Sequence, residues 1–290
     1  MSTHSTEKIL VKTLDILDNL YQENKIERPR VKKIILKQEW NVIFGTNNLC
    51  GMVINFTGVH AVHGEQKLRD RIDLIKGLIG KDLFNVASDY ITSNDIQERS
   101  LAVGSISCMS QPFLSSNQIK KRGFNECRDI MDMLNPTDTV AIVGYGGFVR
   151  KLLGKCKEIH VTEMRPRERF ESVIIGENVD FGPKEIYIHT EKDNKKVLSK
   201  SDIVMITAST LVNGTFDEVI DYSKNARIRG LYGPSGSIIP DVLFENGLNY
   251  QRVYEITNTP RFEYDSINDA SLEVALKESQ TLHCISPRSI

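Results

Sequence analysis

The sequence has few cysteines, a single tryptophan, little proline and almost no net charge. Its 290 residues include 5 cysteines and 9 prolines, and 37 basic residues nearly balance 38 acidic ones. The cysteines are odd in number and form no C-x-x-C pair, which argues against a disulfide framework or a zinc ribbon and indicates a reducing compartment. A formal charge of −1 gives no general attraction for nucleic acid or an anionic membrane.

Long apolar runs are also missing. No stretch approaches the roughly 20 apolar residues that a membrane helix needs, and the N-terminus lacks the basic and apolar regions of a signal peptide. We therefore expect a cytoplasmic protein that binds neither a membrane nor nucleic acid. A chain of 290 residues buries roughly 75% of the surface of its unfolded form, so it needs no disulfide or metal in order to fold.

The first part of the chain mixes helical and strand patterns. Apolar residues at helical spacing predict a helix over residues 6–24, with Thr6 as its N-cap. A three-stranded meander follows, with strands predicted at 31–38, 40–44 and 50–56. Further helices are predicted at 68–78, 80–87 and 96–109, the last capped at Asn94, and the polar stretch 110–124 is typical of a connector.

From about residue 125, strands alternate with short helices. Strands are predicted at 139–143, 158–162, 202–208, 226–232 and 252–256, and helices at 127–134, 148–154, 216–223, 241–246 and 267–281. Such alternation implies right-handed crossovers and a parallel sheet. The sequence thus predicts an α/β protein: an N-terminal α+β domain over 1–115, a connector over 116–124 and a Rossmann-like domain over 125–290.

The strongest local motif is a glycine-rich turn. Gly144, Tyr145, Gly146 and Gly147 follow a buried strand and precede a predicted helix, which allows a ligand to approach the backbone and favours an anion at the helix N-terminus. Glu163 follows 19 residues after Gly144, a spacing at which an acid can bind ribose hydroxyls. In the alternative interpretation the glycines only form a tight turn, and Glu163 pairs with Arg165 and Arg167.

Two further turns are expected at the same edge of the sheet. They are rich in hydroxyls, amides and glycines, and their candidate ligand-binding residues are Ser209, Thr210, Asn213, Gly214 and Thr215 in one and Gly233, Pro234 and Ser235 in the other. Ligands bind beyond the carboxyl ends of the strands in open α/β sheets. Thr215 and Glu218 have the spacing of a capping box. Capping and turn formation explain many of these residues without a ligand.

Candidate metal ligands lie elsewhere. His60 and His63 follow the third strand, and two imidazoles three residues apart near Glu65 are a possible set of donors for a divalent ion. The alternative is that both are ordinary loop histidines. His160 and His189 fall in predicted strands, where packing or solvent exposure accounts for them. No catalytic residue is recognisable.

Several of these stretches together resemble the heavy-metal chelation family. The matching segments are Val140-Ala-Ile-Val-Gly-Tyr, Glu163-Met-Arg-Pro-Arg, Thr210-Leu-Val-Asn-Gly-Thr, Leu231-Tyr-Gly-Pro-Ser and, more weakly, Gly80-Lys-Asp-Leu. The resemblance implies an enolase N-terminal-like domain, a Rossmann-like domain and a ligand site between them that takes metals or metal chelates. The chain departs from the family at Gly104-Ser105-Ile106, where Leu-Asn-Ala is usual, so any contact made by that asparagine is absent here.

Three functional hypotheses remain open from the sequence. The first is binding of a small anionic or metal-chelating ligand in the interdomain cleft, in metal homeostasis or metallophore metabolism, with a divalent transition metal as a candidate cofactor. The alternative is an enzyme that binds S-adenosylmethionine or NAD(P) through the Gly144 turn and Glu163 for group or hydride transfer. The third is a homo-oligomeric scaffold whose glycines are structural.

Overall fold

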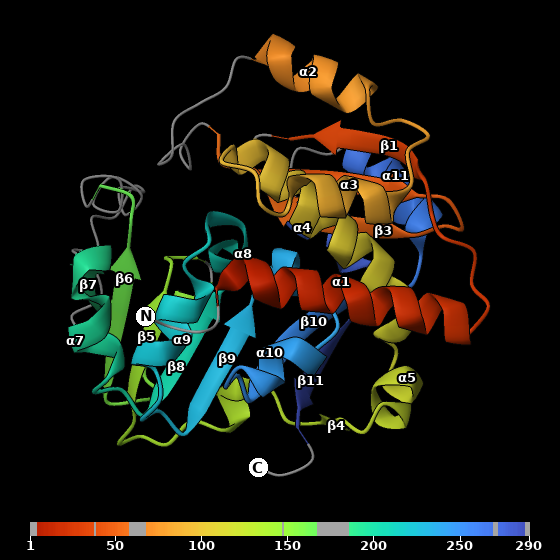
Figure 1. Ribbon diagram of the computed structural model, residues 1–290. Coiled ribbons are helices and arrows are strands. Elements are labelled where there is room, and N and C mark those ends of the chain that lie inside the picture. The colour runs from red at the N-terminus through yellow and green to blue at the C-terminus, as the bar shows by residue number, and fades with distance from the viewer. Residues whose placement is uncertain are drawn as a thin grey trace.

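The computed structural model describes residues 5–37, 39–57, 68–146, 148–166, 186–268 and 272–287. It contains a three-stranded sheet in the N-terminal part and an eight-stranded, mostly parallel sheet in the C-terminal part. The arrowheads of β6 and β9 in the larger sheet point toward the side on which the N-terminal part lies (Figure 1). The predicted fold class is therefore confirmed.

The small sheet is the predicted antiparallel meander. Its strands are β1 (Val31–Leu36), β2 (Trp40–Gly45) and β3 (Cys50–Ile54), in the order β1-β2-β3. Asn47 and Asn48 connect β2 to β3 with φ angles of 60° and 56°, the left-handed conformation that a tight hairpin requires. The helices of this part are α1 (Thr6–Glu23), α2 (Leu68–Lys76), α3 (Leu83–Tyr90) and α4 (Ile96–Ser110).

Helix α4 lies directly on the small sheet because two glycines remove the side chains between them. A Cβ atom on Gly51 would lie 2.2 Å from the carbonyl oxygen of Gly104, and one on Gly104 would lie 2.8 Å from Ile43. The neighbouring Ser105 is fully buried, and its hydroxyl donates to the carbonyl of Leu101 within the helix. Ser105, the position that differs from the usual Leu-Asn-Ala, therefore packs in the core.

The larger sheet has the strand order β4-β11-β10-β9-β8-β5-β6-β7. Its parallel strands are β5 (Thr139–Val143), β6 (Glu158–Glu163), β7 (Ile186–Thr190), β8 (Ile203–Thr207), β9 (Ile228–Tyr232) and β10 (Tyr250–Ile256). Strands β11 (Gln280–Ser286) and β4 (Asn125–Glu126) complete the sheet, β11 antiparallel to β10 and β4 antiparallel to β11. Among the parallel strands, this is the doubly wound order of a Rossmann fold.

The helices of this part are short. They are α5 (Ser116–Lys121), α7 (Asn194–Leu198), α8 (Ser209–Asn213), α9 (Phe216–Tyr222), α10 (Asp241–Glu245), α11 (Thr259–Asn268) and α12 (Leu272–Lys277). Single 3₁₀ turns are η2 (Gln111–Phe113), η3 (Ile130–Asp132), η4 (Val149–Leu152), η6 (Glu191–Asp193) and η7 (Pro234–Gly236). Within the described residues, no helix combines the length and the apolar character needed to cross a membrane.

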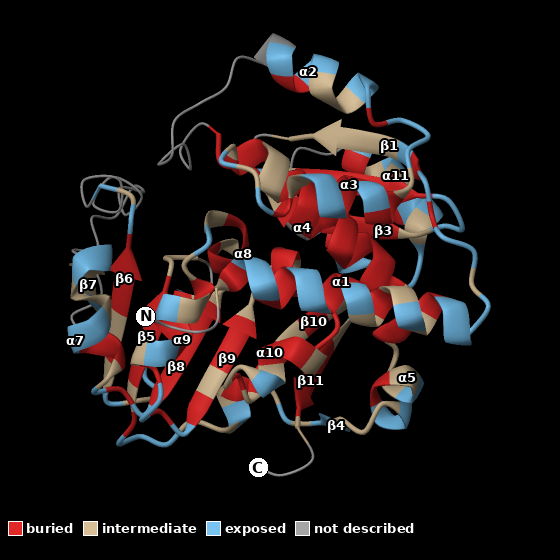
Figure 2. Cartoon of the chain, in the orientation of Figure 1, coloured by how far each residue is buried: buried red, intermediate tan, exposed pale blue. Residues whose placement is uncertain are grey.

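One hydrophobic core runs through both parts of the molecule. It extends from α1 and α4 to the residues of α8, α9 and α10 that cover one face of the larger sheet. Helix α4 is coloured buried over much of its length, whereas the visible side of α1 is largely exposed or intermediate (Figure 2). The hydroxyl of Ser110, at the end of α4, also accepts a hydrogen bond from the backbone of Ile239. The N-terminal part is thus packed firmly on the sheet.

Several local predictions were wrong. The predicted helix 267–281 is instead the end of α11, the short helix α12 and the start of β11, a strand whose second half is buried against the sheet. Ser5 rather than Thr6 caps α1, and Asp95 rather than Asn94 caps α4. The connector contains the helix α5.

A further correction concerns the predicted helices 127–134 and 148–154. Each is a short 3₁₀ turn, η3 and η4. The glycine-rich turn therefore does not lead into a full helix, and the helix dipole expected to attract an anion there is largely missing.

Candidate functional site

The topological switch point of the sheet lies between β5 and β8. From β5 the chain continues through β6 and β7 on one side, and then returns to β8, β9 and β10 on the other. Crossovers that diverge from two adjacent strands leave a crevice beyond their carboxyl ends. The loops at this crevice are those that follow Val143 and Thr207, and they include the glycine-rich turn.

Close packing fixes the start of the glycine-rich turn. Gly144 has a φ of +89°, and a Cβ atom there would lie 2.9 Å from the methyl carbon of Thr207. The hydroxyl of Tyr232 donates to the carbonyl of Gly144 at 2.7 Å, and burial raises the pKa of this tyrosine, which keeps it a donor. Glycine is required here by the backbone conformation and by the close contact. These contacts bring the ends of β5, β8 and β9 together.

Gly146 differs from Gly144. A Cβ atom built on it has no neighbour within 4 Å, and its φ is not positive. It is partly exposed, as are Gly144 and Tyr145. The turn therefore presents backbone to open space at the switch point, where a ligand could contact it.

Glu163 and Arg165 form a buried ion pair beneath the turn. The Glu163 carboxylate accepts hydrogen bonds from the amide of Tyr145 at 2.8 Å, the amide of Arg165 at 2.9 Å and the guanidinium of Arg165 at 2.9 Å. Arg165 also donates to the carbonyl of Tyr145 at 2.7 Å. Burial raises the pKa of Glu163, but the hydrogen bonds and charge of Arg165 outweigh it and the net shift is downward.

This arrangement matches the alternative interpretation of Glu163. Its carboxylate ties the end of β6 to the glycine-rich turn and already accepts three hydrogen bonds. A nucleoside bound through its ribose hydroxyls would compete with Arg165 for the same oxygens. The geometry therefore gives Glu163 a positioning role for the turn.

The residues of α8 have mixed environments. Ser209 is partly exposed and its hydroxyl contacts that of Thr207 at 3.1 Å, whereas Thr210 is buried and donates to the carbonyl of Thr207 at 2.7 Å. Ser209 is thus a candidate ligand contact, and Thr210 holds the helix start.

The end of α8 is an ordinary C-cap. Gly214 takes a φ of +78° and ends the helix, and the side-chain oxygen of Asn213 accepts from the amide and the hydroxyl of Thr215. The predicted capping box from Thr215 is therefore absent, because its hydroxyl faces back to Asn213. The side-chain amide of Asn213 lies 3.7 Å from the sulfur of Met164, next to Glu163.

The turn after β9 joins the sheet to the N-terminal part. Gly233 has a φ of +98°, Pro234 opens the 3₁₀ turn η7, and Ser235 is 1% exposed. The hydroxyl of Ser235 accepts a hydrogen bond from the amide of Ile54 in β3 at 2.9 Å. At this turn, side chains and backbone of β3 and α4 pack on the edge of the sheet. Helix α8, after β8, also contacts α4 and β3, so the edge is more open at the glycine-rich turn after β5.

The structure brings most of the predicted residues to one edge of the sheet, but in different roles. Gly144, Thr210, Gly214, Gly233 and Ser235 shape or close this edge. Gly146, Ser209 and Arg165 remain partly exposed. Gly147, Arg167, His60 and His63 lie outside the described residues. Within those residues, no group of three or more histidine, cysteine or acidic side chains is placed to hold a metal ion.

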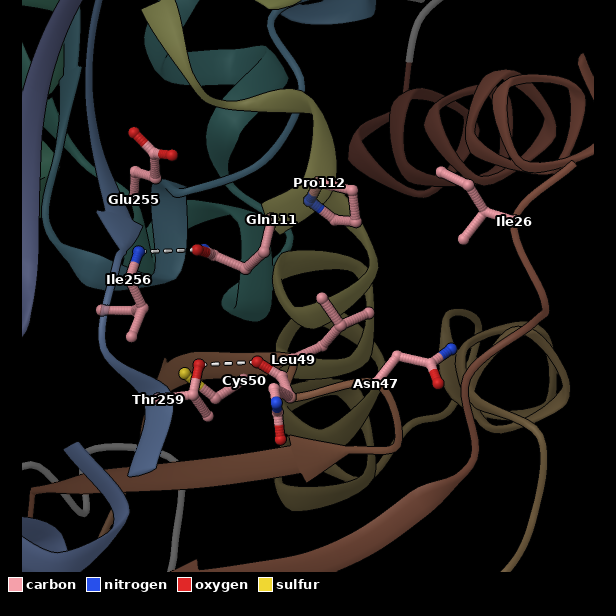
Figure 3. A pocket seen from close by; sticks show the side chains of 10 residues that line it. Ile26, Asn47, Leu49, Cys50, Gln111, Pro112, Glu255, Ile256 and Thr259 are labelled. Atoms are coloured by element: carbon pink, nitrogen blue, oxygen red, sulfur yellow. Dashed lines mark hydrogen bonds between the residues drawn. The ribbon is translucent and has the colours of Figure 1, made fainter. Parts of the chain in front are cut away.

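A pocket of about 290 Å³ lies between the two parts of the molecule (Figure 3), and none of its lining residues was among those predicted from the sequence. Its lining combines the hairpin residues Asn47 to Cys50 with Gln111 and Pro112 after α4 and with residues at the end of β10. Figure 3 shows the Gln111 amide bonded to the backbone of Ile256, a distance of 2.8 Å. The only charged lining residue is Glu255, which bonds to His283 at 2.7 Å. A pocket without a basic residue does not suit an anionic ligand.

These features define a class of protein: a Rossmann-like α/β protein whose carboxyl edge is packed under an N-terminal α+β unit. Residues 129–262 match the sequence profile of the family described as "putative heavy-metal chelation". An uncharacterized protein of Methanocaldococcus jannaschii is 22% identical over 200 residues, which is 69% of this chain and 67% of that protein.

Two solved structures share the fold along almost their whole length. One, a protein of unknown function from Desulfitobacterium hafniense, has a TM-score of 0.67 at 20% identity and covers 94% of this chain and 98% of its own. The other, from Pyrococcus horikoshii, has a TM-score of 0.66 at 19% identity and covers 96% and 99%. Both are members of the family that matches residues 129–262. The chain therefore resembles this heavy-metal chelation family over residues 129–262 and shares the fold of its two solved members, as its sequence motifs indicated.

Proposed function

We propose that this protein binds a small metal-chelating ligand, or its metal complex, at the switch point between β5 and β8. The observation that carries the proposal is the open backbone of Gly146 at this crevice, in the turn whose Tyr145 carbonyl binds the Arg165 guanidinium, together with the partly exposed Ser209 after the adjacent strand. The family description agrees with such a ligand.

The chemistry of the edge fits a ligand with carboxylate groups. Arg165 carries a positive charge at the turn, where it donates to the carbonyl of Tyr145, and its side chain is 17% exposed. The Ser209 hydroxyl donates to that of Thr207 at 3.1 Å and would redirect this hydrogen bond to a bound carboxylate, and the glycine backbone allows close approach. Since η4 is only a four-residue 3₁₀ turn, the helix dipole contributes little, and recognition depends on these side chains.

Calorimetric titration with nickel citrate tests the proposal. We expect heat of binding with the wild-type protein, and at least tenfold weaker binding, equal to about 1.4 kcal/mol, in Gly146→Val. That substitution fills the crevice without backbone strain, because Gly146 has no close neighbour and no positive φ. Gly154→Asn is the matched control, since it adds a side chain to open space at the opposite edge of the sheet, and asparagine tolerates its φ of +71°.

An unchanged affinity in Gly146→Val would place the ligand elsewhere. The absence of heat with both free transition metals and their citrate complexes would remove the proposal. Thermal-shift measurements with S-adenosylmethionine and NAD+ test the enzymatic alternative. A rise in Tm that disappears in Glu163→Gln would favour that alternative and assign Glu163 to a ribose.

A further inference from the structure

Two histidines on adjacent strands point their ring nitrogens at one another. Nδ1 of His160 in β6 lies 3.0 Å from Nε2 of His189 in β7, and the ring planes are inclined by only 19°. The rings lie on the same face of the sheet at its β7 edge. His160 has 22% of its side chain exposed, so an ion in solution can reach the pair.

A carboxylate orients the first of these rings. Nε2 of His160 lies 3.4 Å from the Glu158 carboxylate, which favours the tautomer with its proton on Nε2. Nδ1 of His160 is then unprotonated and accepts the hydrogen bond from His189. Histidines that bind metals usually donate their other ring nitrogen to a carboxylate in this way.

The surroundings hold the pair in place. The ring of Tyr187 is stacked on that of His160 with centroids 4.9 Å apart. Thr162 lies directly across from His189 in the strand register, and its buried hydroxyl oxygen has no hydrogen-bond partner in the structure. A water molecule bound to an ion at the histidines would offer that hydroxyl a partner.

We propose that His160 and His189 bind a divalent transition metal such as Ni²⁺, Zn²⁺ or Cu²⁺. Two imidazole nitrogens that bind one ion at about 2.0–2.1 Å, at an angle near 90°, lie roughly 3 Å apart. The observed 3.0 Å separation therefore needs rotation of the rings but no displacement of the strands. On binding, the proton of His189 moves from Nε2 to Nδ1, so both ligating nitrogens present lone pairs.

The remaining coordination positions are open to water or to an incoming chelator, because the protein supplies two donors. Neutral imidazole is a preferred ligand for these borderline metals. The site is separate from the proposed function at Gly146 and does not depend on it.

Titration of the whole protein with NiCl₂ tests this inference, with ¹⁵N-histidine NMR as a second readout. We expect His160→Gln and His189→Gln each to weaken nickel binding at least tenfold. The double variant should bind nickel at most about twofold more weakly than either single variant. Glu158→Gln should weaken it about tenfold through loss of ring orientation. The matched control is His283→Gln in β11, on the other side of the sheet from β6 and β7, which should leave the affinity unchanged.

Ni²⁺ should perturb the ring nitrogen signals of His160 and His189 in the wild-type protein, a readout that does not depend on the stability of any variant. Unchanged signals for both rings would overturn the inference, as would full affinity in both single variants. Gly146→Val separates the two proposals, since it should keep the nickel affinity of the histidine pair while losing nickel citrate at the switch point.

Discussion

The ion pair between Glu163 and Arg165 allows the role of the glycine-rich turn to be measured. Glu163 has 7% of its side chain exposed and Arg165 has 17%, so both charges are largely removed from water. In Arg165→Met the Glu163 carboxylate stays buried without its cation. Breaking a buried pair in this way costs about 3 kcal/mol.

The reciprocal substitution should cost less. Glu163→Gln keeps one oxygen that can accept from the amide of Tyr145 or Arg165, but loses the charge that binds the guanidinium. A charge-assisted hydrogen bond contributes about 1.5–3 kcal/mol, so we expect a loss of about 2 kcal/mol. The double variant should show a coupling energy of about 2 kcal/mol between the two side chains.

Urea unfolding followed by circular dichroism measures these free energies, and its pH dependence gives a further check. The pKa of Glu163 is lower in the folded than in the unfolded protein, so its stabilisation is present above the unfolded pKa and is lost as the pH falls through the folded pKa. Glu163→Gln should remove that part of the acid slope. A coupling energy below about 0.5 kcal/mol would refute the inference that this pair holds the turn.

Three further predictions concern other contacts. Gly51→Ala should destabilise the protein by about 3 kcal/mol in urea unfolding, because its Cβ atom would lie 2.2 Å from the Gly104 carbonyl oxygen. Gly146→Ala, the control, should change stability by less than about 0.5 kcal/mol, since its Cβ atom has no neighbour within 4 Å. Similar losses in the two variants would contradict the close packing of α4 on the small sheet. Ser235→Ala should lower the free energy of unfolding by about 1–2 kcal/mol, because it removes the acceptor of the Ile54 amide hydrogen bond. The control Ser209→Ala should have little effect. Equal losses in the two variants would exclude a stabilising link between β3 and the larger sheet through Ser235. Hydrogen bonds from Ser116, His283 and Lys120 hold the pKa of Glu126 at about 2 against the opposing effect of burial. Glu126 is 33% exposed, so solvent screening leaves it a stabilisation of about 1 kcal/mol. This stabilisation should be present above pH 4.5 and be lost toward pH 2 in acid unfolding curves. A wild-type curve identical to that of Glu126→Gln would disprove it.

Sequence patterns predicted the sheets well because strand periodicity and buried apolar runs are local properties. The meander over 31–56 and the strands at 139–143, 158–162 and 226–232 appear at nearly the predicted positions. The same reasoning misassigned the segment 267–281, where amphipathic residues suit either a helix or a strand. The pairing of β11 with β10 ended the helical pattern at residue 280, and that pairing is a tertiary interaction.

For the candidate ligand residues, too, the sequence predicted the location but not the contacts. The sequence identified the turns that meet at the edge of the sheet, since glycines and hydroxyl residues after buried strands are visible in any sequence. It could not separate Gly144, which Thr207 and Tyr232 hold tightly, from Gly146, which faces open space. It also left open whether Glu163 serves a ribose or Arg165.

The amino-acid sequence alone determined the fold class and the resemblance to the family, because both depend on short-range patterns of apolar residues, glycines and motifs. Only the tertiary structure decided which side chains meet. His160 and His189 are 29 residues apart in the chain, and the register of β6 against β7 brings their rings into contact. Strand register and helix packing depend on interactions between distant segments, and no local pattern encodes those distances.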